Sequence, residues 1–113
     1  MAEQYLRQPV ASFILKALQS LGGSASKKAI KEEIVADTSI DISYEQAFEP
    51  RISKNGTLYN PFNLDFNFGL INLLACGYIE DYGRRGDITL TEQGRTANYA
   101  EFPSVDEKEK INK

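Results

Sequence analysis

Residues 66–95 read FNFGLINLLACGYIEDYGRRGDITLTEQGR, and this stretch decides the fold. Its first part carries apolar residues at helical spacing and ends at Gly77, the kind of residue that commonly ends a helix. Two short runs rich in β-branched and aromatic residues follow, at 78–82 and 88–91. Glycines at both ends of the connecting segment 83–87 permit a turn between them. The stretch therefore predicts a long helix followed by a β-hairpin.

The long helix extends upstream of this stretch. Asn60 is a favourable N-cap residue, and Pro61 suits the first helical position. From there the apolar residues recur every three or four positions, at Phe62, Phe66, Leu70, Leu73 and Leu74. We therefore expect a helix over 60–77 with an apolar face directed into the core.

The remaining segments contain shorter helical patterns. Apolar residues spaced by three and four predict helices over 10–21 and 27–35, and a capping box at Ser43 predicts a helical turn over 44–48. Thr91 caps a last helix that runs to about Ala100. Residues 53–56 have the composition of a loop.

This order of elements predicts an α+β, mostly α fold, the winged helix-turn-helix. It has a three-helix core, a β-hairpin wing and a C-terminal helix. We place the winged-helix domain at 1–100. Residues 101–113 are charged and poor in apolar residues, so we expect a flexible tail or linker there.

Composition narrows the functional classes. The chain has 113 residues, of which 42% are hydrophobic, so one core is expected. It contains no His and a single Cys, Cys76, which excludes an internal disulfide and a His-containing zinc site, and we expect no cofactor. No apolar run is long enough to cross a bilayer or to form the centre of a signal peptide. The sequence predicts a cytoplasmic protein without a membrane partner.

The charge balance weighs against a nucleic-acid partner. The net charge is −3. Four acidic and three basic residues in 101–113 give that segment −1, which leaves −2 for the rest of the chain. Binding to phosphates requires a basic surface, so any such surface on this chain must be local.

Residues 66–95 resemble the wing region of the N-terminal domain of Mrr-type restriction proteins. That family shows a helix with a leucine-rich end and a glycine, then a strand, an Arg-Gly tip and a Leu-Thr-x-x-Gly-Arg helix start. Here the matching residues are Leu73, Leu74 and Gly77, Arg85-Gly86, and Leu90-Thr91-Glu92-Gln93-Gly94-Arg95. The first helix fits the family loosely, and residues 38–60 match no part of it.

The resemblance implies a DNA-binding module that reads double-stranded DNA, plain or carrying modified bases. Contact would come from helix 60–77 and the wing tip 83–87. The resemblance also implies a nuclease domain elsewhere in the same full-length protein, joined through a linker such as 101–113. The chain itself would then be the reading domain of a restriction or defence system.

Candidate contact residues fall into three groups. Arg84 and Arg85 occupy the predicted wing tip, where guanidinium groups pair with phosphates or enter a narrow minor groove. On the long helix, Asn60, Asn63 and Asn67 carry amides that are able to hydrogen-bond to base edges, although helix capping and ordinary surface positions explain such amides equally well. The third group is basic and consists of Lys27, Lys28 and Lys31 on the second helix and Lys54 in the following loop. A lysine face of this kind contacts the backbone or is simply solvated.

Two further hypotheses remain open. One is a stand-alone transcriptional regulator that acts as a homodimer, paired through its first or last helix. The other is a winged helix that binds protein rather than DNA, which the acidic balance favours. An enzyme is not expected. Without His there is no Ser-His-Asp triad, and the adjacent acids Glu32-Glu33 and Glu80-Asp81 point apart instead of forming a dyad.

Overall fold

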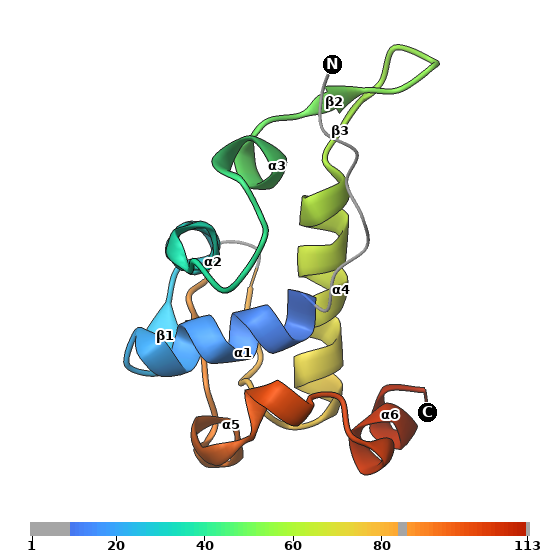
Figure 1. Cartoon of the computed structure of the whole chain (residues 1–113). Helices are drawn as coiled ribbons and strands as arrows, with labels where there is room; N and C mark the ends of the chain where they lie inside the picture. The colour runs from blue at the N-terminus through green and yellow to red at the C-terminus, as the bar shows by residue number, and fades with distance from the viewer. Residues whose placement is uncertain (1–9, 84–85, 113) are drawn as a thin grey trace.

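The computed structural model describes residues 10–83 and 86–112, and it is a mostly α-helical chain with two small antiparallel sheets (Figure 1). In chain order the elements are α1 (Val10–Ser20), β1 (Ser24–Ala25), α2 (Lys27–Ala36), α3 (Tyr44–Phe48), β2 (Arg51–Ile52), β3 (Leu58–Tyr59), α4 (Pro61–Ala75), β4 (Ile88–Thr89), α5 (Glu92–Thr96), the 3-10 turn η1 (Tyr99–Glu101) and α6 (Val105–Ile111).

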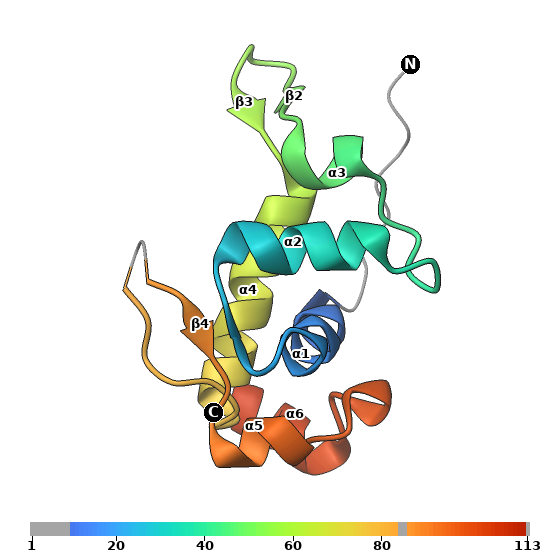
Figure 2. The same ribbon diagram turned by 90° about the vertical axis from the view of Figure 1, so that its left-hand side faces the viewer.

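The core lies where α1 crosses α4. Figure 2 shows α1 in front of α4, with α2 on one side of it and α5 on the other. The helices α1, α2 and α4 each bury an apolar face, as the spacing predicts. The fully buried large side chains are Ile14, Leu15 and Leu18 of α1, Ile30 and Ile34 of α2, and Phe62, Phe66, Leu70 and Leu73 of α4, together with Ile88 of β4. Gly69 of α4 packs on α1, because a Cβ there would lie 3.1 Å from the backbone of Ala11.

The long helix begins and ends as the sequence predicts. Asn60 caps its N-terminus and Pro61 is its first residue. At the C-terminus, the N–H of Tyr78 donates to the carbonyl of Leu73 (3.0 Å) and the N–H of Gly77 to that of Leu74 (3.0 Å). This pair of hydrogen bonds is a Schellman cap, and it requires the positive φ of +78° at Gly77. Cys76, directly before this glycine, is a buried core residue.

The predicted hairpin is present but short. Ile79 bridges Leu90 in antiparallel fashion, and the N–H of Glu80 donates to the carbonyl of Thr89 (2.9 Å). We call residues 78–90 the wing. On its other side, β4 pairs with β1, a segment in which the sequence predicts no strand. This pairing fastens the wing to the start of α2.

A second hairpin occupies the segment expected to be a loop. β2 pairs with β3, placing Arg51 opposite Tyr59 and Ile52 opposite Leu58. The turn is closed by hydrogen bonds from the N–H of Ser53 to the carbonyl of Thr57 (2.9 Å) and from Gly56 back to Ser53 (3.0 Å). We call residues 51–59 the arm. It projects from the N-terminal end of α4 (Figure 1).

The C-terminal segment differs from the flexible tail that we expected. Residues 105–111 form α6, which begins with a capping box between Ser104 and Glu107. Phe102 and Glu107 are buried, and the hydroxyl of Tyr78 donates a hydrogen bond to the carboxylate of Glu107. Low apolar content did not prevent docking, because one aromatic ring and one hydrogen-bonded carboxylate anchor the segment. The preceding helix α5 is also shorter than expected, since it ends at Thr96.

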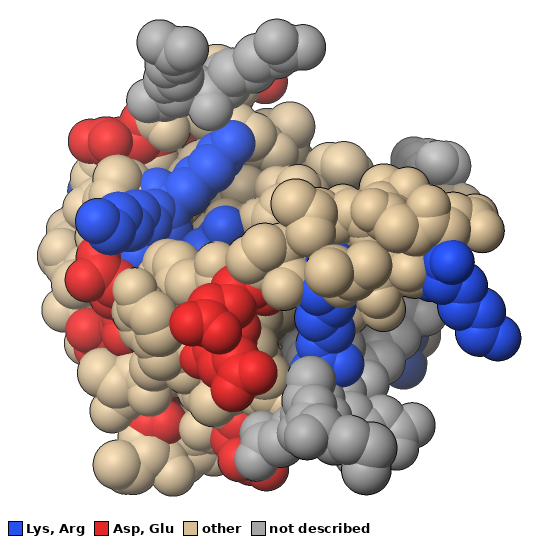
Figure 3. Space-filling view, turned by 90° about the horizontal axis from the view of Figure 1, so that it is seen from above, with Lys and Arg blue, Asp and Glu red and all other residues tan. Residues whose placement is uncertain are grey.

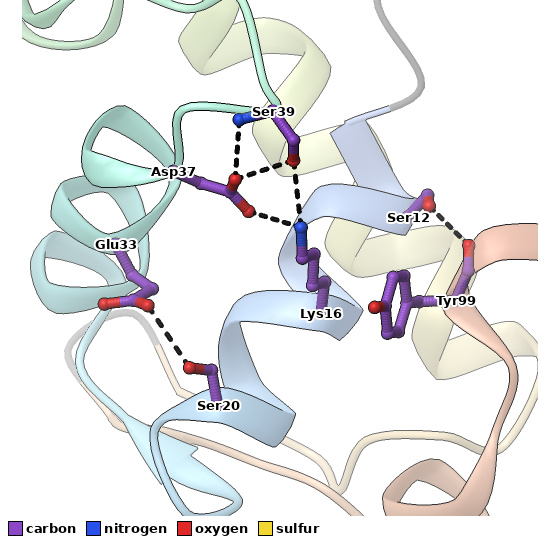
Figure 4. A network of polar contacts seen from close by, with 7 residues as sticks. All are labelled: Ser12, Lys16, Ser20, Glu33, Asp37, Ser39 and Tyr99. Carbon is purple, nitrogen blue, oxygen red and sulfur yellow. Dashed lines mark hydrogen bonds and ion pairs between the residues drawn. The ribbon is translucent and has the colours of Figure 1, made fainter.

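Polar contacts tie α1 to its neighbours (Figure 4). Lys16 Nζ forms a salt bridge with Asp37 Oδ2 at 2.6 Å, and Asp37 also accepts two hydrogen bonds from Ser39. The hydroxyl of Ser12 donates to the carbonyl of Tyr99 (2.5 Å). Among the described residues, no helix is both long enough and apolar enough to cross a membrane.

Candidate nucleic-acid interface

The three lysines of α2 lie beside the wing. α2 starts at the N-cap Ser26, directly after the strand that pairs with β4. Lys27 Nζ is 5.4 Å from the ring centroid of Tyr82, so the first turn of α2 lies against the wing close to residue 83. Lys28 is exposed. The structure therefore places the lysine face next to the described part of the wing.

The side chain of Lys31 contacts two residues of α4 within the same chain. Its Nζ donates to Asn63 Oδ1 at 2.6 Å and lies 4.9 Å from the ring centroid of Phe66. Burial, reinforced by the nearby charge of Lys27, lowers the pKa of Lys31. Its ammonium group is therefore less available to a phosphate than that of Lys28.

The three candidate asparagines at the N-cap and in the first half of α4 divide into two structural residues and one exposed residue. Asn60 accepts from the N–H of Asn63 (2.9 Å) and donates to the carbonyl of Glu49 (3.1 Å), so its amide joins the end of α3 to the start of α4. Asn63 accepts from Lys31. Asn67 is exposed and is the candidate amide best able to reach a ligand without breaking such a contact. The capping interpretation thus accounts for Asn60.

The arm adds a further basic group. Lys54 is exposed at its turn, away from α2. In Figure 3, which views the molecule from above, Lys and Arg side chains stand in separate groups with Asp and Glu side chains between them. On this face the basic groups therefore do not form one continuous positive surface.

Arg84 and Arg85 lie outside the described residues. The residues on either side of them are described, and the N–H of Gly86 donates to the carbonyl of Gly83 (3.3 Å). Glu80, Asp81 and Asp87 of the wing are exposed. These three carboxylates would weaken the attraction of the wing for phosphate.

Comparison with protein-family models, with curated proteins and with solved structures found no match to this chain. The resemblance of residues 66–95 to Mrr-type proteins stays a prediction from the sequence.

One feature of α4 was missed in the analysis of the sequence. Besides its buried face, the helix exposes a second apolar face that includes Leu64, Phe68 and Ile71. The helix contains no Lys or Arg, and its single charged residue is Asp65. The signal was present, since these apolar residues recur at helical spacing on the side opposite Phe66. A helix that reads a major groove offers polar side chains to base edges, and the middle of this face does not.

Chemically, the candidate contact residues described by the structure offer ammonium and amide groups. No group of three or more His, Cys, Asp or Glu side chains within 10–83 and 86–112 is arranged to hold a metal ion. Cys76 is buried, and burial, together with the charge of Glu107, raises the pKa of its thiol. The arrangement is suited to binding.

Proposed function

We propose that this chain is a winged-helix module that binds duplex nucleic acid, with DNA as the preferred form. The observation that carries the proposal is the position of the α2 lysines beside the wing, where Lys27 lies over the ring of Tyr82. In helix-turn-helix proteins, a helix beside the recognition helix crosses the sugar-phosphate backbone. α2 is the element of this chain with the charge and position for that contact.

In this proposal the contacts are divided among elements. Lys28 pairs with phosphates next to the wing, and Lys54 provides a second backbone contact from the arm. Asn67 is the amide on α4 that reaches base edges. The nuclease partner in the same longer protein, and the role in a restriction or defence system, follow from the Mrr resemblance alone and belong to the proposal.

Fluorescence-anisotropy titration of labelled duplex at two salt concentrations tests the proposal. Wild type is compared with Lys28→Ala/Lys54→Ala and with the control Lys108→Ala/Lys110→Ala, which removes the same charge from exposed positions on α6. We expect the first pair to weaken binding by about tenfold and to reduce the slope of log K against log salt by roughly 2. We expect the control pair to change binding little.

Two outcomes would contradict this proposal. Equal losses in both double variants would mean that only the net charge matters. No binding at low salt, to plain and methylated duplexes alike, would remove nucleic acid as the ligand. If binding is observed, Asn67→Ala tests base reading, because losing a base contact lowers affinity for some sequences and leaves others unchanged.

A second function, protein binding, is favoured by the exposed apolar face of α4. Contiguous apolar surface on a folded domain marks sites where another macromolecule docks. A stand-alone dimeric regulator would use both kinds of surface, one for the duplex and one for its partner.

A further inference from the structure

The outer face of α4 has the composition of an interface. Leu64, Phe68 and Ile71 are 54%, 59% and 55% exposed, and Leu74 beside them is 36% exposed. We call these four residues the outer stripe. Since the opposite face of α4 is buried in the core, where the helix packs mainly on α1, the helix is apolar on both sides, and a helix that is apolar all round is normally covered all round.

The spacing of the outer stripe matches a coiled-coil seam. Leu64, Phe68 and Ile71 of the stripe and the neighbouring exposed Ala75 are separated by four, three and four residues, which is the alternation of core positions in a heptad repeat. Leu74 lies at the edge of this seam. The residues that α4 buries within its own domain, Phe66, Gly69, Leu70 and Leu73, fall at the other heptad positions. One helix can therefore serve its own core and a second helix at the same time.

We propose that the outer stripe pairs with the same stripe of a second copy of this chain, with the two α4 helices antiparallel. In this register Phe68 of each copy packs against Ile71 of the other, and Leu64 packs against Ala75. A large side chain thus meets a smaller one at each layer, which suits close packing. Because the contact is isologous, it closes as a dimer.

The distribution of charge along α4 favours a second copy of the chain as the partner of the outer stripe. The only charged residue on α4 is Asp65, at the edge of the stripe. In the antiparallel register Asp65 faces Asn72 of the second copy, whose amide is a hydrogen-bond donor, and the two Asp65 carboxylates stand at opposite ends of the pair. No like charges meet at the seam, so a second copy meets no electrostatic barrier there.

The apolar area of the stripe suits the centre of a dimer interface. At about 200 Å² for a whole large apolar side chain, the exposed fractions of the stripe correspond to roughly 400 Å². A standard interface buries ~800 Å² per partner, of which roughly 56–65% is apolar. The stripe therefore supplies most of the apolar area of such an interface.

Sedimentation velocity or light scattering up to about 1 mM chain measures the self-association. We expect a concentration-dependent dimer for wild type and at least about 30-fold weaker association for Phe68→Glu. The control is Tyr44→Glu, which replaces another exposed aromatic residue, on α3 and outside the stripe. It should dimerise like wild type. Circular dichroism checks that each variant is folded.

A charge pair tests the register. Phe68→Glu and Ile71→Lys should each be monomeric alone, but a mixture of the two should form a heterodimer. Only the antiparallel register places Glu at position 68 against Lys at position 71. A wild type that stays monomeric throughout the concentration range would overturn the proposal and leave the stripe to a different protein. Failure of the mixed pair to associate would overturn the antiparallel register.

This inference does not depend on binding to nucleic acid. The stripe variants change no lysine, and the Lys28/Lys54 variant changes no stripe residue. Wild type that dimerises but binds no duplex, or binds duplex but stays monomeric, therefore shows which of the two proposals has failed.

Discussion

At the scale of single residues, the Thr-x-x-Gly segment at the start of α5 has a clear physical role. The hydroxyl of Thr91 donates to the carbonyl of Gly77 (2.6 Å) and accepts from the N–H of Gly94 (3.1 Å), which fastens the end of α4 to the start of α5. Gly94 is buried against the backbone of Tyr78. A Cβ at position 94 would lie 2.0 Å from the carbonyl oxygen of Tyr78, so no side chain fits there.

Gly94→Ala should therefore destabilise the domain strongly. We expect a loss in the free energy of unfolding at or above the upper end of the roughly 1–3 kcal/mol typical of overpacking, because the clash is with backbone. Gly83→Ala is the matched control, since a Cβ there meets nothing within 4 Å. Urea unfolding followed by circular dichroism measures both. Equal stability of the two variants would contradict the close approach of α5 to Tyr78.

Asp37 makes stability depend on acid pH. Hydrogen bonds from Lys16 and from Ser39 lower the pKa of Asp37 to about 2, and the bond to Asp37 in turn raises the pKa of Lys16. Since the pKa of Asp37 is lower in the folded chain than in the unfolded one, the contribution is complete above about pH 4 and is lost as the pH falls toward 2.

Asp37→Asn should accordingly be less stable than wild type at neutral pH, with the difference shrinking between about pH 4 and pH 2. Asp41→Asn, an exposed carboxylate nearby, is the control and should follow the pH profile of wild type. Urea unfolding at a series of pH values measures the difference. A gap between wild type and Asp37→Asn that is constant over this range would rule out the Lys16–Asp37 bond as its source.

At the scale of elements, the helices could be predicted and the small sheets could not. The starts and ends of α1, α2 and α4 follow from local signals, namely apolar spacing, Ser26 and Asn60 as caps, and Gly77 as a stop. Each strand of the arm is two residues long, and its apolar residues Ile52, Leu58 and Tyr59 are all exposed, so no alternation marks it. β1 is two residues long, and only its partner β4, far along the chain, makes it a strand. Such pairing is a tertiary effect.

Helix α6 could have been predicted in part. Ser104 followed by Glu107 is a readable capping box, but the high charge of the segment pointed to a flexible tail. The decisive contact is the hydrogen bond from Tyr78 to Glu107, between residues 29 positions apart. Of the candidate contact residues, the position of Lys27 beside the wing and the internal use of Asn63 also depend on such long-range contacts.

Tyr78→Phe should loosen α6. The hydrogen bond to Glu107 and, to a smaller extent, burial raise the pKa of Tyr78 to about 12, because the hydroxyl must keep its proton to donate this bond. Removing the hydroxyl leaves the Glu107 carboxylate short of a donor, at a cost of about 1–3 kcal/mol. Hydrogen exchange at amides 105–111 should accelerate, whereas Tyr44→Phe, at an exposed position, should leave it unchanged. Unchanged exchange in Tyr78→Phe would show that α6 is held by other contacts.

At the scale of the whole molecule, the acidic balance limits any affinity for phosphate. Glu80 and Asp81 are exposed on the wing, near the α2 lysines. Replacing both by Gln and Asn should strengthen binding to duplex severalfold at low salt, because each removes a repulsion at short range. Asp106→Asn/Glu109→Gln on α6 changes the net charge equally and should have a smaller effect. Anisotropy titration of both double variants measures the gain in duplex affinity. Equal gains in the two would show that the net charge of the chain, and not the position of the carboxylates on the wing, sets the affinity.

The side chain of Gln19 on α1 donates to the carbonyls of Gly94 (3.0 Å) and Ala97 (2.9 Å), 75 and 78 residues further along the chain. On a ribosome, α1 is made first but cannot complete these bonds until the segment around α5 has emerged. At roughly 5–20 residues per second, several seconds pass in which its apolar face is open to chaperones and to other nascent chains. The domain should therefore close late, near the end of its own synthesis, and nascent chains halted before residue 94 should stay sensitive to protease.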